Sequence, residues 1–166
     1  MLHHASFSVH DPARAAALTA ELVCGRAVRA PCPPFPAEPW FVIFGDEAGS
    51  LIELTPWGSV LAPDRRGISN DADMRPHSAS HVLVGTPHTA SEVLALAAQH
   101  GLRAAHANAG LFEFVKVWVE DSLLLELLPP EFAPAYVECF GAAGVASVEA
   151  RLRSLEQEIA RQVAAA

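Results

Sequence analysis

The chain has 166 residues, enough for one domain with a sizeable core or for two small modules that share one. Hydrophobic residues make up 51% and charged residues 18%, which excludes an intrinsically disordered chain. The formal charge of −8 argues against nucleic acid as a partner, because phosphate binding needs a cationic surface. No apolar run approaches the roughly 20 residues of a membrane span, so no membrane partner is expected.

A cytoplasmic location is expected from two further features. No basic segment followed by an apolar one opens the sequence, so no secretory signal is predicted. The cysteines are odd in number and lack the spacing of a metal-binding pair; they are Cys24, Cys32 and Cys139. Reduced thiols in a cytoplasmic protein are the simplest interpretation.

The first third of the chain predicts the order strand, helix, strand, strand, strand. Residues 3–9 alternate as a strand, and Asp11 can cap a helix that has Pro12 at its first position. We expect this helix to run to about Val23 and to stop at Gly25. Further strands are predicted near 26–30, 40–45 and 50–55.

A second set of elements repeats this order after a polar segment rich in turn formers. A strand is predicted from His81, and Thr89 with Glu92 forms a capping box for a helix that Gly101 ends. Further strands are predicted near 102–107, 112–119 and 122–128. Beyond them, apolar residues recur every three or four positions over 145–164, which predicts an amphipathic helix. That helix could pack on its own sheet or on a partner subunit, and the sequence leaves both open.

The chain contains an internal repeat of one unit in two copies. "LIELTP" at 51–56 has a near copy in "LLELLP" at 124–129, and "HASFSVHDPARAAALTAELVCGRA" at 4–27 parallels "HVLVGTPHTASEVLALAAQHGLRA" at 81–104. We therefore expect two βαβββ modules, a linker and a C-terminal extension. The predicted boundaries are 1–57 for the first module, 58–79 for the linker, 80–130 for the second module and 131–166 for the extension.

The repeat places His4 and Glu53 in positions equivalent to His81 and Glu126. Side chains alternate along a strand, so both glutamates can point into the concave face of a sheet whose other face carries the helices. Imidazole nitrogen and carboxylate oxygen suit divalent cations. Ni²⁺, Zn²⁺, Co²⁺, Fe²⁺ and Mn²⁺ all accept this donor set. His3 has the opposite strand parity, which favours His4 as the ligand.

The motifs "HHASFSVHDPARA", "GSLIELTP", "SHVLVG" and "SLLLELLPP" resemble those of the glyoxalase I, bleomycin-resistance and extradiol-dioxygenase group, the vicinal oxygen chelate superfamily. The resemblance covers about residues 3–130 and implies an α+β fold. Paired βαβββ modules would form an incomplete eight-stranded barrel around the metal, with the C-terminal helix added. Family members commonly dimerise and can take metal ligands from both chains, so a homodimer is expected.

The resemblance also implies metal ligands and a reaction. The metal positions of a bacterial-type glyoxalase I fall on His4, Glu53, His81 and Glu126, and this resemblance implies Ni²⁺, Co²⁺ or Zn²⁺ in preference to Fe²⁺ or Mn²⁺. The implied enzyme is a metal-dependent lyase or isomerase that binds a small substrate through vicinal oxygens and stabilises an enediolate. Glu126 is the preferred catalytic base, with Glu53 as the alternative.

One departure argues against glutathione as a cosubstrate. Glyoxalase I has an Arg four residues after its first metal His, and here that position is Ser8. The cations that could replace it are Arg65, Arg66, Arg75 and Lys116.

Two other functions remain as alternatives. An Fe²⁺ dioxygenase would use His4, His81 and Glu126, and a metal-independent protein would bind a drug or metabolite. Glu53 argues against the dioxygenase, because it would fill a coordination position that oxygen chemistry keeps open. The four ligand-type residues argue against simple sequestration, which needs none of them.

Overall fold

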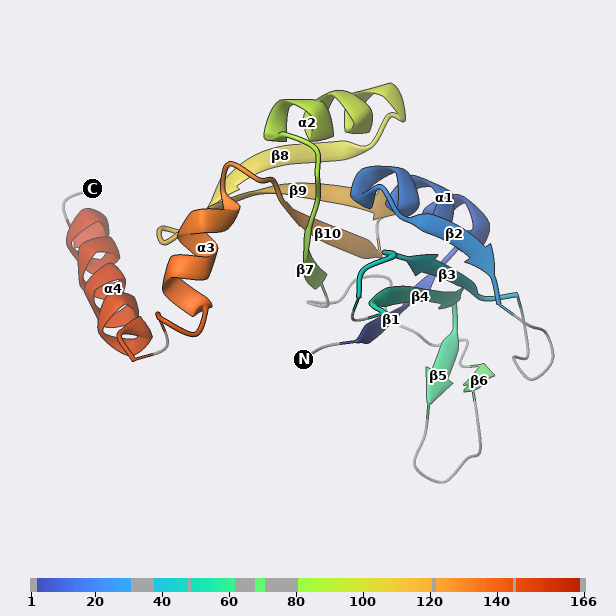
Figure 1. Cartoon of the computed structure of the whole chain (residues 1–166), viewed down its shortest axis with the longest axis horizontal. Coiled ribbons are helices and arrows are strands. Elements are labelled where there is room, and N and C mark those ends of the chain that lie inside the picture. Colours follow the sequence, from blue (N-terminus) through green and yellow to red (C-terminus); the bar gives the residue numbers. More distant parts are fainter. Residues whose placement is uncertain are drawn as a thin grey trace.

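The computed structural model of the chain describes residues 3–30, 38–47, 49–61, 68–70, 81–120, 122–144 and 146–164. The fold is α+β, with two four-stranded mixed sheets (Figure 1). The strand order is β1-β4-β3-β2 in the first sheet and β7-β10-β9-β8 in the second. This confirms the paired βαβββ modules. The two four-stranded sheets, as described, do not close into a barrel.

The first sheet contains β1 (His4–Val9), β2 (Arg26–Arg29), β3 (Trp40–Ile43) and β4 (Leu51–Pro56), and α1 (Pro12–Val23) connects β1 to β2. β1 pairs with β4 in parallel, and the other pairs are antiparallel. Asp11 caps α1 as predicted, because its carboxylate accepts a hydrogen bond of 3.0 Å from the backbone N–H of Arg14.

The end of α1 differs from the prediction in one detail. The left-handed residue after the helix is Cys24, with φ of 51°, and not Gly25. Gly25 has another role, since a Cβ at this position would lie 2.7 Å from the carbonyl oxygen of Ile43. The missing side chain therefore lets the turn approach β3 closely.

The second sheet contains β7 (His81–Gly85), β8 (Arg103–Asn108), β9 (Glu113–Glu120) and β10 (Leu123–Leu128), and α2 (Ala90–Gln99) connects β7 to β8. The predicted capping box of Thr89 and Glu92 is present at the start of α2. β7 and β10 are parallel, as β1 and β4 are. The β9–β10 pairing contains a bulge between Leu123 and Leu124, which shifts the register of all later pairs by one residue.

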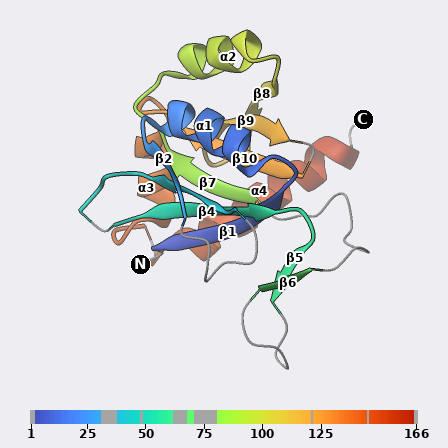
Figure 2. The same cartoon turned by 90° about the vertical axis from the view of Figure 1, so that its right-hand side faces the viewer.

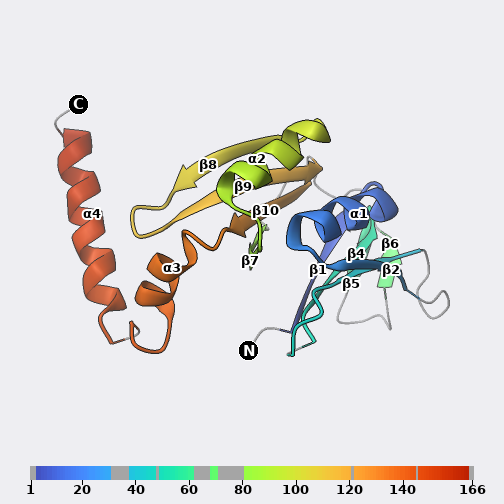
Figure 3. The ribbon, with the colours of Figure 1, turned by 45° about the horizontal axis from the view of Figure 1, so that its top comes forward.

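Each helix lies on one face of its own sheet, α1 over the first and α2 over the second (Figures 1 and 3). The buried apolar residues beneath the helices form one cluster that runs through both modules. Its strand residues are Val9, Val42, Ile52, Leu54, Val115, Val117, Val119, Leu123, Leu125 and Leu127. The faces opposite α1 and α2 are here called the open faces; they carry His4 and Glu53 on the first sheet, and His81 and Glu126 on the second.

Besides the shared apolar cluster, polar contacts join the two modules. Thr86 donates a hydrogen bond of 2.6 Å to the carbonyl oxygen of Leu22, and His100 lies 2.7 Å from a carboxylate oxygen of Glu21. The Glu120 carboxylate accepts hydrogen bonds from the backbone N–H groups of His10 and Asp11, at 2.6 and 2.9 Å. These contacts lie at the edges of the modules and do not cover the two glutamates of the open faces.

Leu125 gives a direct test of the shared core. The side chain is fully buried, so Leu125→Ala should lower the free energy of unfolding by about 2–5 kcal/mol through lost transfer energy and an unfilled cavity. Urea denaturation measures this loss. Leu152→Ala is the control, because Leu152 is 38% exposed and its loss should cost much less. Equal losses in the two variants would contradict the assigned core.

The predicted linker contains a short hairpin. β5 (Ser59–Leu61) pairs antiparallel with β6 (Ile68–Asn70), and the two strands project away from both sheets (Figure 2). Strands of three residues are too short to show an alternating pattern, which is why the sequence did not predict them.

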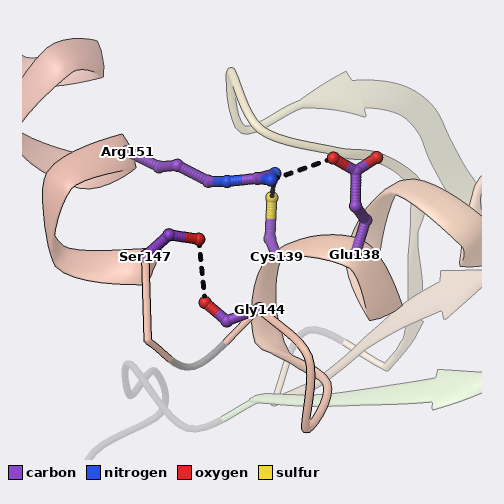
Figure 4. Close-up of polar contacts among 5 residues, drawn as sticks. All are labelled: Glu138, Cys139, Gly144, Ser147 and Arg151. Atoms are coloured by element: carbon purple, nitrogen blue, oxygen red, sulfur yellow. Dashed lines mark hydrogen bonds and ion pairs between the residues drawn. The ribbon is translucent and has the colours of Figure 1, made fainter.

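Two helices follow the second module, α3 (Ala133–Phe140) and α4 (Val148–Ala164), and α4 matches the predicted C-terminal helix. Arg151 of α4 donates to the Glu138 carboxylate at 2.9 Å and to the Cys139 sulfur at 3.4 Å (Figure 4). In Figure 1, α4 lies beyond the end of the second sheet, and its Leu155 is so close to the turn between β8 and β9 that a Cβ at Gly110 would lie 2.5 Å from the leucine side chain. None of the described helices combines the length and the apolar character needed to cross a bilayer.

Candidate metal centre

The first half-site consists of His4 on β1 and Glu53 on β4. His4 pairs with Leu51, two residues before Glu53, so the two side chains are diagonal neighbours on the open face of the first sheet. Ser6 and Phe41 flank Glu53 directly, from β1 and β3. Glu53 is half-buried and His4 is exposed.

The second half-site consists of His81 on β7 and Glu126 on β10, and it has the same register. His81 pairs with Leu124, two residues before Glu126, so the strand geometry of the first half-site is reproduced. Nε2 of His81 lies 3.7 Å from a carboxylate oxygen of Glu126. The Glu126 side chain is only 14% exposed, whereas that of His81 is 49% exposed.

The second half-site therefore brings an imidazole and a carboxylate together, and the first places the same two groups at diagonal positions on one face of its sheet. The structure does not bring the two half-sites together within the described part of one chain. No group of three His, Cys, Asp or Glu side chains in this part lies in an arrangement that could hold a metal ion. A cavity of about 290 Å³ between the modules is lined by His4 and by residues 82–85 of β7, but not by Glu53, His81 or Glu126.

The donor set of each half-site fits a divalent cation. Glu126 is a largely buried carboxylate on an otherwise apolar strand, where a charge is costly unless it is paired. An imidazole beside a carboxylate supplies two ligands of the kind that zinc, nickel, cobalt, iron and manganese share. One half-site offers two protein donors, so a shell of four protein ligands would need both half-sites.

The open face of the second sheet also carries Lys116, which the sequence named as a possible replacement for the missing Arg, and aromatic and basic residues that it did not assign to the site. Lys116 on β9 is the direct cross-strand partner of Glu126, and Trp118 is the partner of Leu124. The guanidinium carbon of Arg103 lies 5.8 Å from the ring centroid of Trp118. The sequence predicted the strands β9 and β10 but not which of their residues lie opposite each other. The bulge that sets this register has no sequence signal of its own.

The other cations named from the sequence, Arg65, Arg66 and Arg75, lie outside the described residues. Ser8, which stands where glyoxalase I has Arg, is engaged with its surroundings. Its hydroxyl lies 3.3 Å from that of Thr55 and donates to the carbonyl oxygen of Ser59 at 3.1 Å. This end of the first open face therefore offers hydroxyl groups where the glutathione-dependent enzyme has a cation.

No family model matches the sequence, and no curated protein resembles it at the sequence level. Solved structures do share the fold. The fosfomycin resistance protein FosX from Listeria monocytogenes aligns with a TM-score of 0.53 and 13% identity, over 78% of this chain and 92% of that chain. A variant of that protein, with a TM-score of 0.51 and 13% identity, was solved with Mn(II) and 1S,2S-dihydroxypropylphosphonic acid.

Two further structures extend this similarity. TnmS3, an antibiotic-binding protein from Streptomyces sp. CB03234, aligns with a TM-score of 0.53 and 16% identity, over 78% of this chain and 95% of that chain. The trypanothione-dependent glyoxalase I of Leishmania major aligns with a TM-score of 0.51 and 16% identity, over 99% of this chain and 98% of that one. The structural alignments establish a common fold. Sequence identities this low do not establish a common activity, which has to be argued from the residues of this chain.

Proposed function

Because the chain has the fold of the vicinal oxygen chelate superfamily, we propose that it is a divalent-metal-dependent lyase or isomerase that acts on a small molecule through two neighbouring oxygen atoms. One observation carries the proposal: the same His and Glu pair occurs in the same register on the open face of both sheets. A structural role for these residues would need a separate explanation in each module. A metal ligand set explains both pairs together.

The four ligands in this proposal are His4, Glu53, His81 and Glu126. A bound cation would supply a Lewis acid that polarises the two substrate oxygens and stabilises the negative charge that develops on them. We assign the proton transfer between the adjacent substrate carbons to Glu126, whose side chain is only 14% exposed and which lies beside Lys116 on the neighbouring strand. Glu53 lies beside Phe41 and Ser6, and its proposed role is coordination.

We propose that the complete site forms between two chains, with the first half-site from one and the second from the other. The separation of the half-sites within one chain supports this arrangement. Large exposed apolar side chains support an association of chains as well. Those in the described part of the chain are Ile43, Val137, Phe140, Leu152 and Ile159, and four of these five belong to α3 and α4.

Metal analysis of protein purified without added metal tests the proposal. Stoichiometric nickel, cobalt, zinc or manganese supports the lyase or isomerase, and iron with substrate-dependent oxygen uptake would instead support the dioxygenase. A second candidate, non-catalytic binding of a small molecule, is favoured by the similarity to TnmS3. Protein that contains no metal, and whose melting temperature does not rise on metal addition, would overturn the enzyme proposal in favour of this one.

Loss of a single ligand should remove the stabilisation that the metal provides. At a metal concentration about 100 times Kd, binding stabilises the native state by about 2.7 kcal/mol, or roughly 5–10 °C in Tm for a chain of this size. Glu53→Ala and His81→Ala should lose this increment, and thermal scans with metal and with EDTA measure it. His106→Ala is the matched control, because His106 forms a comparable pair with Glu113, at 2.8 Å, outside the half-sites. An undiminished metal increment in both ligand variants would refute the assignment.

A further inference from the structure

Lys116 is the only lysine in the chain, beside ten arginines. Everywhere else, the sequence meets its need for positive charge with Arg. Lys differs from Arg in carrying a compact point charge with three donors in place of a planar fork. Lys116 therefore supplies a compact cation, and the structure places it next to the second half-site.

The position of Lys116 depends on the bulge in the β9–β10 pairing. Leu123 pairs with Glu120 before the bulge and Leu124 pairs with Trp118 after it, so Glu126 comes to lie opposite Lys116. In the register before the bulge, Glu126 would lie opposite Val117, and Lys116 would point into the core. The bulge therefore brings the lysine onto the open face, about 5 Å from the glutamate in Cβ separation.

The Lys116 ammonium is not used to neutralise Glu126. It lies over the ring of Phe114, 5.7 Å from the ring centroid, and in the described part of the chain it forms no ion pair with a carboxylate. Lys116 is partly buried, and its aliphatic stem lies along the open face of the sheet. A cation that merely balanced Glu126 would be expected at ion-pair distance from it.

Lys116 also departs from the internal repeat. Its equivalent in the first module is Phe41, which lies directly opposite Glu53 as Lys116 lies opposite Glu126. The duplicated strand therefore accommodates an apolar residue at this position. The lysine is not required by the sheet, and it makes the second half-site chemically different from the first.

We propose that Lys116 binds an anionic group of the substrate, which makes the substrate a small oxyanion such as a carboxylate or a phosphate ester or phosphonate. The inference rests on the proposed function, because it assumes that the reacting part of the substrate binds beside Glu126 and that the anionic group lies next to it. The cross-strand partner of Lys116 on β8 is Ala105, which carries no charge. Trp118, on the same strand and face as Lys116 and partly exposed, offers apolar contact for the body of the substrate.

The single lysine permits a direct measurement. Protein grown with lysine labelled with ¹³C at Cε gives one lysine signal, which reports only on Lys116. Lactate and inorganic phosphate should shift this signal saturably, and propane-1,2-diol, the uncharged analogue of lactate, should not. The titrations use metal-free and Zn²⁺-loaded protein, with ligand up to about 100 mM, where even millimolar affinities approach saturation. If lactate alone acts, the anionic group is a carboxylate, and if phosphate alone acts, it is a phosphoryl or phosphonyl group.

A matched control moves the lysine to an exposed position. In the variant Lys116→Arg/Arg153→Lys, the labelled residue lies on α4, where Arg153 is 63% exposed, and its signal should not respond saturably to either anion. Lys116→Met should weaken anion binding, followed by tryptophan fluorescence, by at least about tenfold. It should leave the metal content unchanged. Absence of a saturable shift in both protein forms, or equal shifts in the control, would overturn the proposal for Lys116 while leaving the metal site to its own test.

Discussion

Two heterodimers built from ligand variants are expected to differ in metal content, with about one ion in the first and almost none in the second. The first joins a His4→Ala/Glu53→Ala chain to a His81→Ala/Glu126→Ala chain. If each site takes one half-site from each chain, this dimer has one intact site and one site that lacks all four ligands. It should bind about one metal ion, although each double variant alone binds none.

The second heterodimer joins a wild-type chain to a chain with all four substitutions. In the shared arrangement each of its sites lacks one half-site, so metal content should fall to near zero, with an affinity loss well above the 100-fold typical of outer-shell changes. Two affinity tags isolate each heterodimer, and elemental analysis measures the metal. A tagged wild-type pair, with two ions expected, is the control. The reverse result, no metal in the first dimer and one ion in the second, would show that all four ligands come from one chain.

Glu126→Gln is expected to lower the rate of proton transfer by about 10²–10⁴-fold, the range for loss of a general base. The glutamine keeps an oxygen that can face the metal but cannot take up a proton. Hydroxyacetone is a suitable probe, because its carbonyl and hydroxyl oxygens are adjacent and its methylene protons exchange into D₂O through an enediol. Loss of the methylene signal in a proton NMR spectrum measures the rate.

Glu53→Gln is the matched comparison, since Glu53 occupies the equivalent position in the first module. It should slow exchange less than Glu126→Gln at equal metal content. The expected difference follows from the neighbours: Lys116 lies beside Glu126, and Phe41 lies beside Glu53. A larger loss in Glu53→Gln, with both variants fully metal-loaded, would assign the base to Glu53.

Much of the fold could be predicted because its signals are local. Asp11 with Pro12, and Thr89 with Glu92, mark helix starts through hydrogen bonds that span three residues, and both caps are present. The repeat then doubled the evidence, because each weak strand in one module had a counterpart in the other. The hairpin of β5 and β6 lacked both kinds of signal, and it was not predicted.

The candidate site was less accessible to sequence analysis. The repeat identified His4 as equivalent to His81 and Glu53 as equivalent to Glu126. In each sheet the His lies opposite the residue two positions before the Glu on the neighbouring strand. The two pairs stay apart because of the way the modules pack. This packing involves contacts of Thr86, His100 and Glu120 with residues far away in the chain. Likewise, the sequence left open what α4 packs against, and the structure shows it linked to α3 through Arg151.

The sequence by itself determined the duplication, the order of elements and the pairing of one imidazole with one carboxylate in each module. These follow from side-chain periodicity and from similarity between two stretches of chain, neither of which needs a folded structure. Tertiary structure decided which residue lies beside Glu126, because one extra residue at the Leu123 bulge exchanges the two faces of β9 relative to β10. It also decided that the half-sites stay apart in one chain, because the packing of two sheets depends on contacts throughout both modules and not on any local pattern.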